Sequence, residues 1–152
     1  LGLAMKSSGA SSMMAEALST GVLAHAPQDW RPFLLLAALY LTTAVLTEIL
    51  SNNATIVIMA PISLELASRI NLVAEDARAF LIATCIAASA SFTTPIGYQT
   101  NTYVYSVGGY RFRDFVKIGL PLNLIYFFSS VTLIACYWRY PPFEGGFGGL
   151  FQ

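Results

Sequence analysis

The distribution of charged residues constrains this chain more than any other feature of its sequence. Four windows contain no charged residue at all: 32–47, 49–64, 79–110 and 118–138. A helix needs about 20 apolar residues to cross the hydrocarbon core of a bilayer. Only the last window has the length of a plain crossing, because the first two are too short and the third is too long. The pattern predicts an all-α integral membrane protein with one ordinary transmembrane helix and several irregular elements.

The transmembrane helix is expected over 115–138. Lys117 and Arg139 bracket its charge-free run, and Tyr137 and Trp138 would lie at the level of the lipid headgroups. Of all residues, 56% are hydrophobic and 11% are charged, against about 25% charged in soluble domains. Eight basic residues balance eight acidic ones, so we expect a lipid environment and no nucleic-acid partner.

The two short windows on either side of Glu48 predict a re-entrant helical hairpin over 32–68. A single helix over 32–64 would be about 50 Å long, which exceeds the bilayer. Its centre, 50–55, reads LSNNAT, and Ser and Asn favour caps and turns. Non-helical backbone at membrane depth is tolerated where protein buries it or where it lines a wet cavity. The alternative is two core helices of a soluble all-α protein, which the equally apolar neighbouring windows disfavour.

A discontinuous helix is predicted over 76–107. An unbroken helix would again be too long, and the stretch 93–101 reads TTPIGYQTN. Its proline removes a hydrogen-bond donor and its glycine relaxes the backbone. We expect one half over 76–92 and a second, shorter half over 102–107, with an unwound centre between them.

The two ends of the chain carry weaker signals. Residues 1–28 contain no apolar run long enough to cross a bilayer, so they predict an interfacial or connecting helix. Residues 141–152 open with two prolines and are rich in glycine, which predicts a flexible tail.

The loop 108–117 sets the expected orientation. Its basic residues outnumber its one acid, Asp114, so the positive-inside rule places this loop in the cytoplasm. The C-terminus and the opening of the hairpin would then lie outside, in a plasma or inner membrane.

Two interruptions of this kind mark the midplane binding site of a transporter. The carbonyl groups of 47–51 end the first arm and would suit a sodium ion. Free N–H groups at Ala54 and Thr55 begin the second arm and would suit an anion. The side chains of 51–53 can serve either ion.

The unwound stretch can complete the same cage through Gly97, Thr100 and Asn101. Neither interruption contains Lys or Arg. We therefore expect an anion to be held by neutral dipoles together with bound cations.

Three stretches carry a resemblance to a known family. Residues 47–55 (TEILSNNAT) resemble the Ser-Asn-Thr hairpin tip of the divalent anion/sodium symporters, and 91–101 (SFTTPIGYQTN) and 108–119 (GGYRFRDFVKIG) resemble two further motifs. The likeness is greatest to the sulfate-type permeases. It implies that 29–140 is part of the transport domain, from the second inverted repeat, and that an N-terminal half is missing.

The resemblance also implies binding residues. Sodium would be bound by Thr47, Asn52 and the carbonyl groups of Leu50 and Gly97. Tyr98 stands where dicarboxylate carriers place a substrate-contacting Thr, which favours a small tetrahedral oxyanion over a citrate-sized one. Together with the dipole argument, the candidate anion-binding residues are Ser51, Asn52, Asn53, Thr55, Tyr98, Thr100 and Asn101.

The expected function is therefore secondary active transport of a small divalent oxyanion, most simply sulfate, driven by sodium, with no other cofactor. A full-length carrier would be a homodimer. Alternatives are a transport-inactive truncated subunit or remnant, transport of a dicarboxylate or arsenite, and proton coupling through Glu48, for which a structural role is preferred. An enzyme is disfavoured, because Ser51 has no His or Lys nearby and His25 is the sole His.

Overall fold

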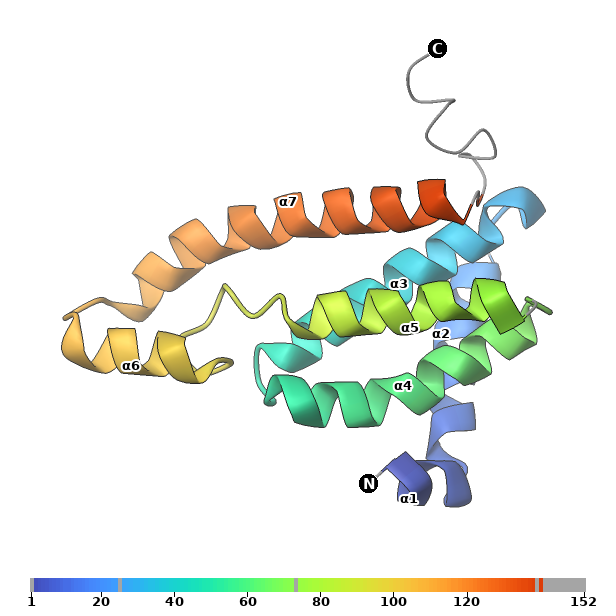
Figure 1. Ribbon diagram of the computed structural model, residues 1–152, viewed down its shortest axis with the longest axis horizontal. Helices are drawn as coiled ribbons and strands as arrows, with labels where there is room; N and C mark the ends of the chain where they lie inside the picture. Colours follow the sequence, from blue (N-terminus) through green and yellow to red (C-terminus); the bar gives the residue numbers. More distant parts are fainter. Residues whose placement is uncertain (1, 25, 73, 139, 141–152) are drawn as a thin grey trace, which may run out of the picture.

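The computed structural model of the chain describes residues 2–24, 26–72, 74–138 and 140. All regular structure in these ranges is helical, which confirms the predicted all-α class (Figure 1). In chain order the elements are α1 (Gly2–Ser7), α2 (Ala10–Leu23), the 3₁₀ turn η1 (Gln28–Trp30), α3 (Arg31–Thr47), α4 (Asn52–Arg69), α5 (Ala74–Ala88), α6 (Gln99–Val107) and α7 (Phe112–Tyr137). The predicted flexible tail, 141–152, lies outside the described residues.

Helices α3 and α4 form a hairpin in the segment where one is predicted. The first arm ends where the N–H group of Leu50 donates to the carbonyl oxygen of Leu46 at 2.8 Å. Ser51 then takes an extended conformation, and its Oγ accepts a hydrogen bond from the N–H group of Ala54 at 3.3 Å. This N-cap starts the second arm immediately. The re-entrant placement of the hairpin in a bilayer stays a prediction.

The break between α5 and α6 lies earlier than the sequence indicates. Helix α5 ends at Ala88 and α6 begins at Gln99, whereas the predicted halves are 76–92 and 102–107. The N–H groups of Thr93 and Thr94 donate to the side chain of Glu48. Because the side-chain oxygens of Glu48, which is distant in the sequence, accept these hydrogen bonds, the N–H groups do not continue the helix. Residues 89–92 are therefore not helical, although they include no proline or glycine.

Two helices are long and apolar enough to cross a membrane, Gln28–Thr47 and Phe112–Tyr137. Only the second is predicted as a plain crossing. The first is predicted as a short arm, because Arg31 and Glu48 limit its charge-free window to 32–47. The helical backbone nevertheless begins before that window, as η1 followed by α3.

Helix α5 is central to the packing, since it lies against α3, α4 and α7. Its alanines Ala79, Ala83 and Ala87 are fully buried and follow one another at a spacing of four residues. Small side chains on one face allow neighbouring helices to approach closely. Larger buried side chains fill the space around them: Leu35, Leu36, Leu39, Tyr40, Met59, Ile62, Leu66 and Phe80.

Helix α2 crosses the hairpin at a steep angle (Figure 1). Arg69 at the end of α4 holds it there, because its guanidinium lies 3.7 Å from the carboxylate of Glu16 and donates to the carbonyl oxygen of Ser12 at 3.3 Å. The interfacial position expected for 1–28 stays a prediction about the membrane.

Candidate functional site

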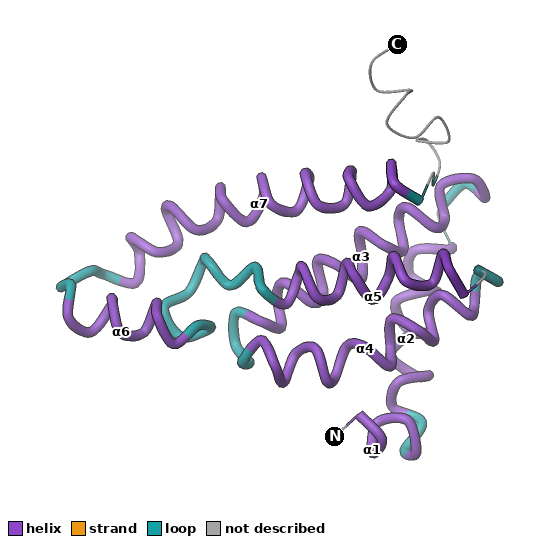
Figure 2. The backbone as a smooth tube through the Cα atoms, viewed as in Figure 1, coloured by secondary structure: helices purple, strands orange, loops and turns teal. Residues whose placement is uncertain are grey.

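The hairpin tip and the unwound segment lie next to each other, although the two are far apart in the sequence. Figure 2 shows both non-helical stretches at the same end of the hairpin. Gly97 lies close to the tip, since a Cβ atom at this position would lie 2.8 Å from the carbonyl oxygen of Thr47 and 2.0 Å from Ser91 Oγ. Ser91 Oγ in turn donates to that Thr47 oxygen at 3.2 Å.

Three oxygen atoms gather where α3 ends, α4 begins and α5 ends. The hydroxyl group of Thr47 donates to the carbonyl oxygen of Ala88, and Thr47 Oγ1 also lies 3.0 Å from Asn52 Oδ1. A hydroxyl group has one proton and can satisfy one of these acceptors at a time. The cluster therefore has an excess of acceptors, placed at the negative ends of α3 and α5. Such a cluster has the chemistry to hold a small cation.

Two helix N-termini converge on the same region. Helix α4 starts at Asn52 and α6 starts at Gln99, after Tyr98 in an extended conformation. Because Gly97 lies against Thr47, the first turn of α6 is carried to the hairpin tip. The positive end of a helix dipole can attract an anion. The prediction that the N–H groups of Ala54 and Thr55 are free for this role is wrong, because that of Ala54 donates to Ser51 Oγ at 3.3 Å and that of Thr55 donates to the carbonyl oxygen of Ser51 at 2.9 Å.

The predicted sodium ligands come together more closely than the predicted anion ligands. Thr47 and Asn52 are in direct contact, and Gly97 lies against Thr47. Leu50 lies in the tip turn, half-buried, between Thr47 and Asn52. The main-chain carbonyl of Ala88 was missed, because any residue type can supply such an oxygen.

The seven predicted anion-binding side chains differ in exposure. Four of them are exposed at the ends of their helices, namely Ser51, Asn53, Tyr98 and Thr100, and Asn52 is half-buried beside Thr47. Thr55 is fully buried one turn inside α4, and its hydroxyl group has no hydrogen-bond partner among the described residues. Asn101 uses its amide group within the chain, since Nδ2 donates to the carbonyl oxygens of Ser91 at 2.9 Å and Thr94 at 3.3 Å.

Glu48 connects the hairpin to two other elements. Its Oε1 accepts from the N–H group of Thr93 at 2.9 Å, and its Oε2 accepts from that of Thr94 at 2.7 Å. Asn123 Nδ2 on α7 donates to Glu48 Oε1 at 2.8 Å. These bonds give the carboxylate the structural role preferred from the sequence. Asn123 was missed, although a lone amide in an apolar helix is a signal for a bond to another helix.

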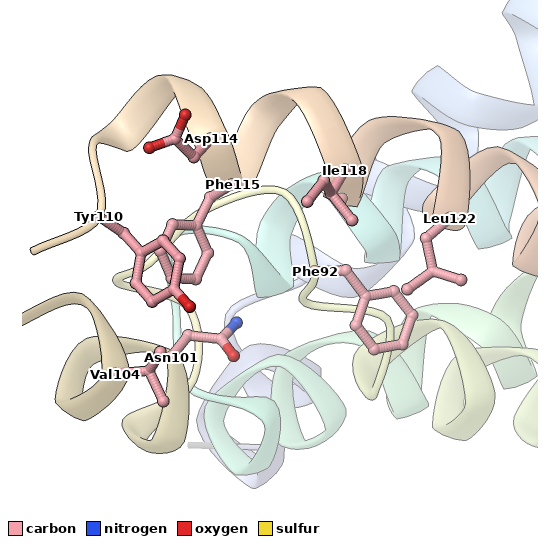
Figure 3. Close-up of a pocket in the computed structure, with 9 residues that line it drawn as sticks. Phe92, Asn101, Val104, Tyr110, Asp114, Phe115, Ile118 and Leu122 are labelled. Atoms are coloured by element: carbon pink, nitrogen blue, oxygen red, sulfur yellow. The ribbon is translucent and has the colours of Figure 1, made fainter. Parts of the chain in front are cut away.

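A cavity of about 340 Å³ lies between α6 and α7, beside this region (Figure 3). Its lining is mainly apolar, with Phe92, Tyr110 and Phe115 among its larger side chains. Asn101 is the one predicted anion-binding residue that reaches it. The cavity therefore differs from the convergence of helix ends at the hairpin tip.

Comparison with known proteins places the chain in a family. Residues 1–141 match the family described as the sodium:sulfate symporter transmembrane region. An uncharacterized transporter of Synechocystis is 44% identical over 93% of this chain. A probable sodium/sulfate cotransporter of Chlamydomonas reinhardtii is 38% identical over 68% of it, and human solute carrier family 13 member 1 is 33% identical over 73%.

The chain spans only part of these relatives, namely 22% of the Synechocystis protein, 11% of the Chlamydomonas protein and 18% of the human protein. The family match nevertheless extends over nearly the whole chain, and two of its helices have the length and composition of membrane spans. The chain therefore belongs to the sodium:sulfate symporter family of integral membrane transporters.

Proposed function

We propose that this chain is the C-terminal part of a secondary active transporter that moves sulfate, or a small oxyanion like it, together with sodium. The observation that carries the proposal is the contact of Gly97 with Thr47. That contact brings two helix N-termini and a cluster of oxygen atoms to one place.

The anion would be held by dipoles rather than by basic side chains. The positive dipole ends of α4 and α6 would attract it, and no Lys or Arg lies in either interruption. The side chains of Ser51, Asn52, Asn53 and Thr100 would add neutral hydrogen bonds, and Tyr98 would limit the size of the substrate. Asn101 would act through the backbone carbonyl groups to which its amide donates, whereas Thr55 is fully buried inside α4 and would not contact the anion in this conformation.

Sodium would occupy the acceptor-rich side of the same region. Its proposed ligands are Thr47, Asn52 and the carbonyl groups of Leu50 and Gly97, to which the structure adds the carbonyl oxygen of Ala88 beside Thr47. The ion would partly offset the charge of the anion. This arrangement would make the binding of each ion favour the other.

The hairpin would enter the membrane and return by the same face, with 108–117 cytoplasmic and the C-terminus outside. The relatives carry most of their length outside the matched region, so a complete carrier would add the larger part of its length, including an N-terminal half, and the carrier would be a homodimer. Transport would follow from movement of the hairpin, α5, α6 and α7 as one body.

The test is uptake of radiolabelled sulfate into vesicles from cells that express the full-length protein, with and without an inward sodium gradient. Asn52→Ala is expected to abolish sodium-stimulated uptake while the protein still inserts into the membrane. Gln28→Ala, which truncates an exposed amide side chain at the start of η1, is the matched control and should transport like wild type. Wild-type uptake by Asn52→Ala would refute the proposed site, and uptake of another anion in place of sulfate would reassign the substrate.

A further inference from the structure

Helix α7 presents two residues, Gly119 and Asn123, to the unwound segment. They lie four positions apart and therefore on the same face of the helix. Neither residue belongs to the candidate binding set. Gly119 lies against Phe92 and Thr93, and Asn123 contacts Thr93, just before the point where the segment meets the hairpin tip.

Gly119 allows the helix to come close. A Cβ atom at this position would lie 2.0 Å from the carbonyl oxygen of Phe92 and 2.7 Å from Thr93 Cα. These neighbours are backbone atoms of another segment, which cannot rotate away as a flexible side chain can. The close approach, rather than an unusual backbone conformation, accounts for the glycine.

Asn123 adds directed hydrogen bonds one turn further along. Its Nδ2 donates to Thr93 Oγ1 at 2.6 Å and to Glu48 Oε1 at 2.8 Å. Its Oδ1 is buried without a partner among the described residues. Burying an unsatisfied oxygen has a cost in free energy. The two hydrogen bonds that the amide nitrogen donates offset this cost and hold the side chain in this orientation.

The contacts continue from Thr94 to the tip. Thr94 Oγ1 donates to the carbonyl oxygen of Glu48 at 2.8 Å and accepts from the N–H group of Gly97 at 3.2 Å. The position of Gly97 against Thr47 thus depends on where Thr93 and Thr94 are held. Glu48 holds both residues through their N–H groups, and helix α7 contacts the same segment through Gly119 and Asn123.

We infer that the Gly119–Asn123 face of α7 is a positioning element, which fixes the unwound segment against the hairpin tip and so sets the spacing of the ion-binding groups. The inference rests on the proposed function for its effect on transport. Its effect on the backbone does not depend on transport, and this difference allows the two ideas to be tested separately.

The first experiment measures sodium-dependent sulfate uptake by the full-length protein. Asn123→Leu removes both donated bonds at similar volume, and Thr93→Ala removes one of them. We expect the half-saturating sodium concentration to rise about tenfold in Asn123→Leu, the ratio that corresponds to losing one hydrogen bond to a charged group. The maximal rate should change little. The double variant should be no worse than Asn123→Leu alone, because the two residues share a bond.

Ser129→Ala is the matched control on α7, since its exposed hydroxyl group bonds only to carbonyl oxygens of its own helix. Gly119→Ala is compared with Gly21→Ala, where a Cβ atom would meet nothing within 4 Å. Both controls should keep the wild-type sodium dependence. Wild-type sodium dependence in Asn123→Leu and Gly119→Ala would overturn the inference. If Asn123→Leu fails to insert into the membrane, the sodium dependence of uptake by Thr93→Ala tests the inference instead.

The second experiment measures amide hydrogen exchange in the purified full-length protein, over a peptide that covers 92–98. Exchange should be faster in Asn123→Leu and unchanged in Ser129→Ala, because the bonds of Glu48 to the N–H groups of Thr93 and Thr94 would open more often. If wild type transports no sulfate, the proposed function fails and this measurement still decides the inference. Unchanged exchange in the variant would overturn it.

Discussion

The carbonyl oxygen of Thr47 lies so close to Gly97 that a Cβ atom on Gly97 would come within 2.8 Å of it. Residue 97 is buried, and its other close neighbours are Ser91 Oγ and Glu48 Cα. The end of the first hairpin arm and the unwound segment can therefore keep this separation only with a glycine at residue 97.

Gly97→Ala is expected to abolish sodium-stimulated sulfate uptake. The added methyl group would push the segment away from Thr47 and widen the proposed cation site, since backbone atoms cannot make room for it. Uptake and surface expression are measured together, with Gly21→Ala as the control. Normal uptake by Gly97→Ala would show that the close contact is not needed for transport.

The hydroxyl group of Thr47 is expected to matter more than the shape of its side chain. Thr47→Val keeps the volume but removes the oxygen beside Asn52 and Ala88, so the half-saturating sodium concentration should rise at least about tenfold. Thr47→Ser keeps the oxygen and should stay near wild type. Sodium activation curves of the two variants provide the measurement, and equal curves would exclude Thr47 as a sodium ligand.

Tyr98 is expected to set the upper size of the substrate. Its side chain is half exposed at the start of α6, where its phenol ring would occupy space needed by a longer anion. Tyr98→Thr should raise the ratio of succinate uptake to sulfate uptake, whereas Tyr98→Phe should leave the ratio unchanged. A competition assay with labelled sulfate measures this ratio. A ratio that Tyr98→Thr leaves at the wild-type value would contradict a role in selectivity.

Substitution of Asp114 is expected to lower the stability of the protein without changing its transport kinetics. Its Oδ2 accepts from the N–H group of Arg111 at 2.8 Å and completes the capping box of α7. Asp114→Ala should lower the free energy of unfolding by about 1 kcal/mol, as expected for a lost helix cap. Asp114→Asn keeps an acceptor oxygen and should lose less. Thermal unfolding in detergent measures the loss, and a change in sodium affinity would point to a further role.

The hairpin and its tip could be predicted because their signals are local. Ser51 caps the second arm through an atom three residues away, and the polar tip stands out between two apolar arms. The end of α5 could not be predicted in the same way. Residues 89–92 contain no helix-breaking residue type, and the helix stops there because Glu48, 45 residues from Thr93, takes the N–H group of that residue.

The candidate site also contains some residues that could be predicted from the sequence and others that could not. Thr47, Asn52 and Gly97 could be named from the resemblance of their motifs to those of the family, and the structure brings them together. Asn123 could not be assigned a partner, because nothing in the sequence states which face of α7 meets the unwound segment. Thr55 and Asn101 have residue types suited to an anion, but burial and internal bonding decide what their side chains contact.

The bonds of Glu48 also determine when the site can be completed during synthesis. Its donors are synthesised after it: Thr93 and Thr94 follow Glu48 by 45 and 46 residues, and Asn123 follows it by 75 residues. Until α7 is synthesised, the side chain of Glu48 lacks the donor that Asn123 supplies, and a buried polar group without its partner has a cost in free energy. The contacts of the hairpin tip are therefore complete only once α7 has been made, and a chain interrupted before α7 lacks the hydrogen bond from Asn123 to Glu48.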